Sequence, residues 1–194
     1  MITVYICTYN PSKKIFPEVL DGIRCQDLAE VEYEVLVVDN GSSYDLERVF
    51  DFSDLPGFRL ISEPKVGKVN AMLTAFSYAR GHLLVMVDDD NILAPDYLSR
   101  AWQIHSENPD LGAFGGSAEA RYLEMPARWF FEHELMIAVR TVKEDFFSYD
   151  VEDGRASPVG AGLVFTRKVV ERFISEVNGN PLWINLDRNG GRLT

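Results

Sequence analysis

The sequence predicts an α/β protein with a doubly wound, mostly parallel β-sheet. In the first half of the chain, short apolar runs rich in β-branched residues alternate with segments of helical periodicity. These apolar runs show little polar alternation, which is typical of parallel strands covered by helices on both faces. Regular alternation of strand and helix implies right-handed crossovers between parallel strands.

The elements of the first half follow one another without an obvious linker. Strands are expected at residues 2–8, 34–39, 58–62 and 82–88. Helices are expected at 11–26, 67–81 and 94–108, with a further helix-compatible segment at 44–52. Pro17 falls in the first turn of the first helix, where its missing N–H costs little.

The second half of the chain is less regular. Strand-like runs occur at 111–121, which is rich in glycine, and at 158–167. An aromatic amphipathic helix is expected at 126–142 and another helix at 168–177. Such a half fits a lobe that closes over the carboxyl edge of the sheet and shapes a pocket there.

Composition excludes several classes of partner and setting. The 194 residues are 46% hydrophobic and 25% charged, as in a single globular domain. A net charge of −11 argues against nucleic acid or an anionic membrane surface as the main partner. Cys7 and Cys25 make neither a disulfide framework nor a metal cluster. With no signal peptide and no apolar run near the roughly 18–20 residues that span a bilayer, a reducing cytoplasmic setting is expected.

Polar clusters follow three of the expected strands. The first strand ends in "TYN" (Thr8, Tyr9 and Asn10), the second in "DNGSS" from Asp39, and the fourth in "DDDN" from Asp88. In open parallel sheets, ligands bind beyond the carboxyl ends of the strands. Three polar clusters at one edge therefore predict a binding site.

The three consecutive aspartates repel one another, so local stability does not explain them. If the strand stays extended, Asp88 and Asp90 project to one side and Asp89 to the other. Two carboxylates on one side suit Mg²⁺ or Mn²⁺, which share their ligand sphere with substrate phosphates. The alternative is a solvated turn that caps the next helix. We favour the metal–phosphate site.

Asp39 has two interpretations that the residues alone leave open. It can form an Asx turn before Gly41, or its carboxylate can accept hydrogen bonds from a nucleobase or ribose. A nicotinamide dinucleotide is not supported, because "TYNPSK" contains no Gly-x-Gly-x-x-Gly pattern.

Taken in order, these motifs resemble a known family, the inverting, metal-dependent nucleotide-sugar glycosyltransferases of family 2. The resemblance rests on "ICTYN", "VLVVDNGSS", "VGK" followed by "ARG", and "VMVDDDNILAPDYL", and it covers residues 2–100. It implies the GT-A fold, a Rossmann-like sheet with a smaller acceptor-side lobe, in one domain over 1–194. Residues 1–108 would then form the donor-binding half and 109–194 the acceptor-side half.

The resemblance also implies a set of site residues. The nucleotide-sugar site would be formed by Thr8, Tyr9, Asn10, Asp39, Gly67, Lys68, Asp88 and Asp89. Asp39 would read the base, most often uracil, and Lys68 would lie near phosphate. The metal, Mn²⁺ or Mg²⁺, would be held by Asp88 and Asp90 between the donor phosphates, where it stabilises charge on the departing nucleoside diphosphate.

The chain departs from the family pattern in two places. Where members often carry an asparagine, six residues after Gly67, this chain has Leu73; Asn70 is out of register and is expected to be an exposed helix residue without a role. The family's general base, a Glu-Asp pair, usually follows a segment like "LDRNGGRL" (186–193), and the chain stops at Thr194. We therefore name no catalytic residue.

The base and any membrane-associating helix are expected beyond Thr194, in a longer protein of which this chain is a fragment. "KEDFF" (143–147) and "VEDG" (151–154) are expected to be acidic loop residues. Aromatic residues can stack on acceptor sugars or pack in the lobe, namely Trp129, Phe130, Phe131 and Trp183. "PVGAG" (158–162) can bring backbone close to a bound sugar or bend a strand.

The leading function is transfer of a sugar from a nucleoside-diphosphate sugar, with a UDP-sugar favoured, to a hydroxyl acceptor with inversion. The acceptor, whether a glycan, a lipid-linked molecule or another hydroxyl compound, is not specified by the sequence. One alternative is a sugar-phosphate nucleotidylyltransferase, which would carry a glycine-rich loop after the first strand. The other is a non-catalytic nucleotide-sugar or glycan-binding module on the same fold.

Overall fold

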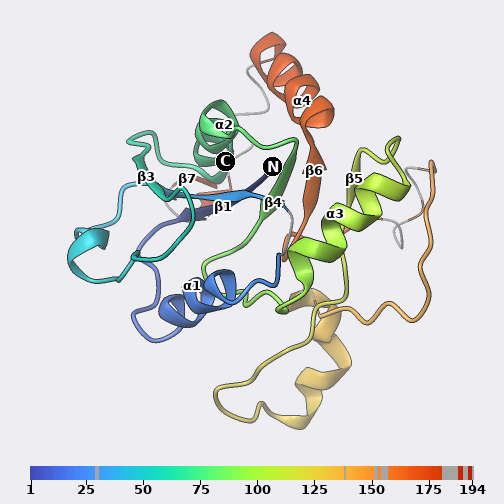
Figure 1. Ribbon diagram of the computed structural model, residues 1–194. Coiled ribbons are helices and arrows are strands. Elements are labelled where there is room, and N and C mark those ends of the chain that lie inside the picture. The colour runs from blue at the N-terminus through green and yellow to red at the C-terminus, as the bar shows by residue number, and fades with distance from the viewer. Residues whose placement is uncertain are drawn as a thin grey trace.

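The computed structural model describes residues 1–28, 31–137, 139–150, 153, 157–180, 188–189 and 192–193. A six-stranded sheet with the order β3-β2-β1-β4-β6-β5 forms its centre (Figure 1). The strands are β1 Ile2–Thr8, β2 Tyr33–Asp39, β3 Arg59–Ser62, β4 Leu83–Met86, β5 Ala113–Phe114 and β6 Val164–Thr166. The helices are α1 Phe16–Arg24, α2 Lys68–Tyr78, α3 Tyr97–Glu107 and α4 Arg167–Gly179. A separate pair is formed by β7 Arg188–Asn189 and β8 Arg192–Leu193.

The sheet is mostly parallel, which confirms the predicted fold class. β3, β2, β1 and β4 run parallel to one another, and β6 runs antiparallel to both β4 and β5. β1 pairs with β2 and β4 along its two edges, and its side chains are buried on both faces of the sheet, as its continuous apolar sequence indicates.

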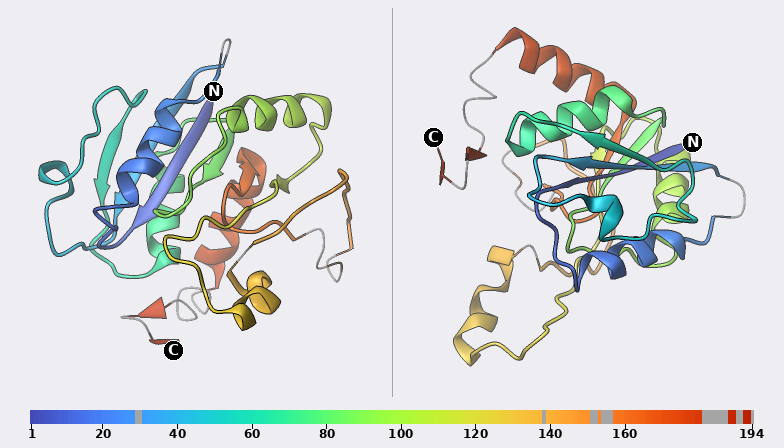
Figure 2. Two further views of the ribbon diagram at one scale, coloured as in Figure 1. Left: turned by 90° about the horizontal axis from the view of Figure 1, so that it is seen from below. Right: turned by 90° about the vertical axis from the view of Figure 1, so that its left-hand side faces the viewer.

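Two apolar clusters cover the two faces of the sheet. Alternate β1 residues point to opposite clusters, Val4 to one and Tyr5 to the other. α1 and α3 pack on the Val4 face, and α2 and α4 on the Tyr5 face (Figure 2). Each fully buried aliphatic or aromatic side chain contributes about 1.5–3 kcal/mol, so the hydrophobic layers on both faces hold the strand ends in place.

Several expected elements are shorter than predicted or of another type. The segment 44–52 contains only the 3₁₀ turn η1 Leu46–Arg48, because Phe50 and Phe52 turn inward to pack edge-on against Phe16. The aromatic segment forms the 3₁₀ element η2 Arg128–Ile137, which is interrupted at His133, instead of an α-helix. The strand-like runs at 82–88, 111–121 and 158–167 form the shorter β4, β5 and β6.

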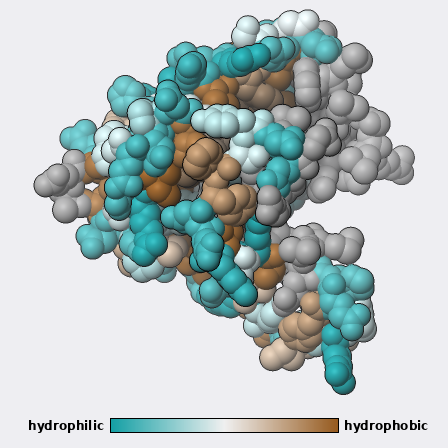
Figure 3. All heavy atoms as spheres, turned by 90° about the vertical axis from the view of Figure 1, so that its right-hand side faces the viewer, coloured by the Kyte–Doolittle hydropathy of each residue, from teal (hydrophilic) through white to brown (hydrophobic). Residues whose placement is uncertain are grey.

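The segment from residue 118 to η2 projects from the body of the protein as a small lobe. In both views of Figure 2 it lies toward the end of β1 opposite the N-terminus. Arg121 joins the lobe to α1 through two hydrogen bonds to the Glu18 carboxylate, of 2.5 and 2.8 Å. The lobe surface carries both hydrophobic and hydrophilic residues (Figure 3).

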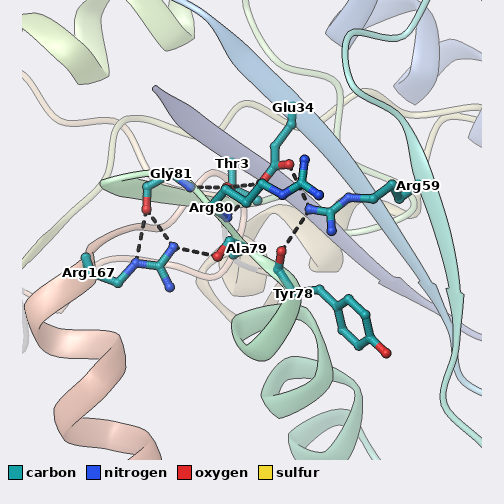
Figure 4. Close-up of polar contacts among 8 residues, drawn as sticks. All are labelled: Thr3, Glu34, Arg59, Tyr78, Ala79, Arg80, Gly81 and Arg167. Atoms are coloured by element: carbon teal, nitrogen blue, oxygen red, sulfur yellow. Dashed lines mark hydrogen bonds and ion pairs between the residues drawn. The ribbon is translucent and has the colours of Figure 1, made fainter.

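The amino edge of the sheet is fastened by a buried carboxylate (Figure 4). Glu34 accepts hydrogen bonds from Thr3 Oγ1 at 2.8 Å, Arg59 at 2.7 Å and the Arg80 backbone N–H at 2.7 Å. Arg59 also donates to the carbonyl of Tyr78, the last residue of α2, at 2.8 Å. These contacts fix the carboxyl end of α2 to β2 and β3.

Arg167 extends this network to the antiparallel part of the sheet. It stands at the start of α4 and donates to the backbone carbonyls of Ala79 and Gly81, which lead into β4 (Figure 4).

Within the described part of the chain, no helix combines the length and apolarity needed to cross a bilayer.

Candidate functional site

The polar clusters predicted at the strand ends lie together at the carboxyl edge of the sheet. Thr8 of β1 is in register with Asp39 of β2, and the Asn40 N–H donates to the Thr8 carbonyl at 2.9 Å. On the other side of β1, the Val87 N–H donates to the Tyr5 carbonyl at 3.0 Å and brings the aspartate run alongside. Parallel pairing thus gathers segments from three neighbouring strands.

Asp89 lies against the end of β1. The Thr8 hydroxyl donates to its Oδ2, and Thr8 itself is buried. Burial raises the pKa of Asp89, the Thr8 hydrogen bond opposes this, and the neighbouring carboxylates of Asp90 and Asp88 raise it further. Three carboxylates thus repel one another at this edge, and a cation nearby would relieve the repulsion.

Asp88, two residues beyond the end of β4, forms an ion pair with a lysine. Its Oδ1 lies 2.9 Å from Nζ of Lys68, the first residue of α2. Asp88 and Asp89 thus point to different partners, as expected for neighbouring residues at a strand end. The pair also joins two segments that the sequence predicts for the same site.

Asp90 does not continue the strand. β4 ends at Met86, and the Asn91 N–H donates to the Asp88 carbonyl at 3.1 Å, which closes a turn in which Asp90 is exposed. The extended backbone that would place Asp88 and Asp90 on one side is therefore not present. Among the described residues, no group of three or more acidic, histidine or cysteine side chains forms a ready-made metal site.

The turns after β1 and β2 are bonded to each other. Asn10, with φ of 51°, accepts hydrogen bonds at its Oδ1 from the Ser43 N–H at 2.8 Å and the Ser43 hydroxyl at 2.9 Å. Its short polar side chain makes this left-handed conformation accessible. Asp39 Oδ1 accepts from the Ser42 N–H at 2.9 Å, which is three residues along the chain and so one residue beyond the span of the predicted Asx turn. Tyr9 is largely exposed beside these turns.

Asn40 is a site residue that the sequence did not single out. It is 6% exposed, and its Nδ2 donates to the carbonyls of Glu63 and Lys65, each at 2.9 Å. Its Oδ1 accepts from the Gly67 N–H at 2.8 Å. Its position next to Asp39, at the end of a buried strand, could have indicated a role in the site. The pair Asn40-Gly41 is, however, also typical of an ordinary turn.

The environment of Asn70 differs from the one predicted. It was predicted to be an exposed helix residue, but it is buried, and its Nδ2 donates to the Val66 carbonyl at 3.1 Å. Its side chain turns back toward the residues that precede α2, where the bond to Val66 gives the buried amide a partner. It thus supports the loop that carries Gly67.

The glycine-containing segment 158–162 reaches the same site. A Cβ on Gly160 would lie 3.6 Å from Asp88 Oδ2 and 3.0 Å from Met86 Cε. The Gly162 N–H donates to the Met86 carbonyl at 3.0 Å, and its own carbonyl accepts from the Tyr97 hydroxyl. Burial raises the pKa of Tyr97 to about 12, so its hydroxyl keeps this proton at neutral pH.

The other predicted residues are less closely tied to the site. Phe130 and Phe131 pack edge-on against Tyr122, whereas Trp129 is 65% exposed on the lobe. Residues 143–147 form an irregular, mostly exposed stretch, as expected of a loop. Trp183, most of "VEDG" and half of "LDRNGGRL" lie outside the described residues.

Comparison with known proteins decides the family. Residues 3–155 match the family described as Glycosyl transferase family 2, which is well over half of the chain. The chain belongs to glycosyl transferase family 2. This confirms the family, fold class and enzyme class that the motifs implied, and the chain is a glycosyltransferase domain.

Two curated relatives illustrate the range of the family. Over 171 residues the domain is 26% identical to a glucosyl-dolichyl phosphate glucuronosyltransferase of Haloferax volcanii, covering 87% of this chain and 53% of the relative. Over 103 residues it is 35% identical to an N-acetylglucosaminyltransferase of Mesorhizobium japonicum, covering 51% of this chain and 24% of the relative. The glycosyltransferase domain thus spans about half or less of these proteins.

Solved structures show the same fold. S. aureus TarS (residues 1–349) superposes with a TM-score of 0.66 at 20% identity, covering 89% of this chain and 48% of that one. The mannosyltransferase PcManGT of Pyrobaculum calidifontis, in complex with GDP-Man and Mn²⁺, gives a TM-score of 0.61 at 26% identity, with 89% and 46% covered.

Proposed function

We propose that the domain binds a nucleoside-diphosphate sugar at the carboxyl edge of its sheet and transfers the sugar, with inversion, to a hydroxyl acceptor. One arrangement carries this proposal: Lys68 paired with Asp88, and Asp89 bonded to Thr8, at the ends of adjacent parallel strands. A cation and acidic groups in one place can hold a diphosphate together with its counter-ion. The positions are those that the family resemblance assigns to the donor.

The two ends of the site would hold different parts of the donor. Asp39, with the Thr8–Asn10 turn beside it, is proposed to bind the base, and we favour uracil. Gly67 and Lys68 are proposed to lie near the diphosphate, because Lys68 already reaches Asp88 across the site. Asp88 and Asp89 would reach the ribose or a metal ion.

The acidic side chains fit Mn²⁺ or Mg²⁺. Their donors are carboxylate oxygens alone, which hard divalent cations prefer, and Mg²⁺ commonly uses only one or two carboxylates besides water and substrate phosphates. Asp88 is proposed to hold the ion together with Asp90, whose exposed side chain stands in the turn that follows Asp88 and not on an extended strand. When bound, it would supply positive charge to the departing diphosphate.

The protein's own contribution to transfer would be positioning and electrostatics. Lys68 brings a positive charge to the phosphate side, and the Gly160 backbone leaves room next to Asp88 for a bound sugar. In-line displacement also needs a general base opposite the leaving diphosphate. We assign that role to none of the described acidic residues.

Relatives indicate the classes of acceptor to be tested. The Haloferax relative is named for a dolichyl phosphate, and an Escherichia coli relative is named chondroitin synthase. We therefore propose a lipid-linked or glycan hydroxyl as the acceptor. A sugar-phosphate nucleotidylyltransferase is less well supported, because the turn after β1 is built from Asn10 and Pro11 and has no glycine.

Thermal unfolding with added nucleotide tests the donor assignment. Uridine, guanosine and thymidine diphosphates would each be added with Mn²⁺ to the wild type and to Asp39→Asn, which keeps an acceptor for the Ser42 N–H. Saturating ligand at 100 times Kd stabilises by about 2.7 kcal/mol, which is readily measured. We expect uridine diphosphate to stabilise most and Asp39→Asn to remove that preference; equal stabilisation by all three nucleotides would contradict the role of Asp39.

A further inference from the structure

We propose that Asn40 is a positioning residue of the donor site, which holds the loop 63–67 and the first turn of α2 where Lys68 can reach Asp88. This inference rests on the proposed function, because it concerns how that site is assembled. Asn40 is not expected to touch the donor itself. Its effect would be transmitted through Gly67 and Lys68.

The side-chain amide of Asn40 makes three hydrogen bonds to one loop, 63–67. Both Nδ2 hydrogens are donated, one to the Glu63 carbonyl and one to the Lys65 carbonyl, and Oδ1 accepts from the Gly67 N–H. The Asn40 backbone N–H is bonded to Thr8. One buried residue therefore ties the ends of β1 and β2 to the segment leading into α2.

The backbone geometry of Gly67 explains how anchoring the loop positions Lys68. Gly67 has φ of 138° and ψ of 138° and immediately precedes α2, which begins at Lys68. A residue other than glycine is strained at this φ, so the entry into the helix is defined by the backbone. Fixing the Gly67 N–H therefore fixes the point from which the Lys68 side chain extends to Asp88.

The other end of α2 provides an internal comparison. Its last residue, Tyr78, is held through Arg59 by Glu34 at the amino edge of the sheet (Figure 4). Both anchors stabilise the same helix, but only the Asn40 anchor adjoins the donor site. A purely structural role would make the two anchors equivalent for nucleotide binding.

Two substitutions separate the hydrogen bonds from side-chain volume and charge. Asn40→Asp keeps the volume and the acceptor for Gly67, but it places an oxygen against the Glu63 and Lys65 carbonyls. Asn40→Ala removes all three side-chain bonds without adding charge. Both should release the loop, and Glu34→Gln serves as the matched control at the far end of α2.

The test is a double-mutant cycle measured by calorimetric titration of uridine diphosphate with Mn²⁺. We expect Asn40→Ala and Asn40→Asp each to weaken binding about 10-fold or more, and Lys68→Met to weaken it similarly. In the Lys68→Met background, the Asn40 substitutions should cost less than about 3-fold, because their effect acts through Lys68. Glu34→Gln should lower Tm yet leave affinity within about 2-fold.

Amide hydrogen exchange of residues 63–68 gives a second readout that needs no ligand. Exchange in this segment should be faster in Asn40→Ala and unchanged in Lys68→Met. Wild-type affinity in both Asn40 variants, additive losses in the cycle, or unchanged exchange would each overturn the inference. If the wild type itself binds no nucleoside diphosphate with Mn²⁺, the proposed function fails and the inference falls with it.

Discussion

Lys68 Nζ lies 2.9 Å from Asp88 Oδ1 and joins the start of α2 to the end of the β4 segment. The two side chains are 53% and 32% exposed, so their attraction is screened by water. Exposed ion pairs contribute about 1 kcal/mol or less to stability. The pair contributes little to the stability of the fold, which is consistent with the phosphate-side role that we propose for Lys68.

Removing the lysine should separate binding from stability. We expect Lys68→Met to lower Tm by no more than about 3 °C, because the exposed pair contributes little. Its affinity for uridine diphosphate should fall about 10-fold, or about 1.4 kcal/mol. Arg48→Met, which breaks the exposed Arg48–Asp45 pair on η1, is the control and should change neither quantity much. Unchanged nucleotide affinity in Lys68→Met would refute a phosphate-side role.

Side-chain volume at Gly160 should restrict the site next to Asp88. A Cβ there meets the flexible end of Met86 at 3.0 Å and Asp88 Oδ2 at 3.6 Å, so alanine should be accommodated and valine should crowd the carboxylate. We expect Gly160→Ala to keep nucleotide affinity within about 3-fold and Gly160→Val to lose about 10-fold. Gly179→Val, at the open end of α4, should leave affinity unchanged. Tight binding by Gly160→Val would show that the donor lies elsewhere.

The two cysteines should differ in reactivity. Burial raises the pKa of the Cys7 thiol to about 12, whereas Cys25 is exposed. At pH 8 the reactive thiolate of Cys7 is then on the order of 10⁻⁴ of the total. A thiol-reactive chromogenic disulfide should therefore titrate one cysteine in the native protein and two after unfolding. The native reaction should disappear in Cys25→Ser; rapid reaction of two thiols would contradict the raised pKa of the half-buried Cys7.

The Glu34 network should be important for stability but not for donor binding. Glu34→Ala leaves the hydrogen bonds of Thr3, Arg59 and the Arg80 N–H without their buried acceptor. We expect a loss of about 2–4 kcal/mol in the free energy of unfolding, measured by urea denaturation. Glu34→Gln, which keeps an acceptor oxygen, should lose less. A loss below about 0.5 kcal/mol in Glu34→Ala would show that the network contributes little.

The sequence predicted the parts of the fold that are determined locally. β1 and β2 carry continuous apolar runs because both faces are buried, and their bounds agree closely with the expected 2–8 and 34–39. The meeting of Thr8 with the aspartate run also followed, because parallel strands end at one edge.

Features that depend on distant partners were not predictable in the same way. The 44–52 segment has helical composition, but packing of Phe50 and Phe52 against Phe16 prevails. Asn40 resembles a turn residue, yet its amide bonds to a loop more than 20 residues further along the chain. The prediction that Asp88 and Asp90 project to the same side assumed an extended strand, but the chain forms a turn at Asp90.

The proposed function depends on a metal-dependent nucleotide-sugar site at the carboxyl edge of the sheet. Calorimetric titration of uridine diphosphate into the wild type, with Mn²⁺ and then with a chelator, tests it most directly when repeated on Asp88→Asn and Asp90→Ala. We expect binding that disappears with the chelator and weakens about 10-fold or more in both variants. Absence of binding to uridine, guanosine and thymidine diphosphates with Mn²⁺ present, or binding indifferent to chelator and to both substitutions, would contradict it.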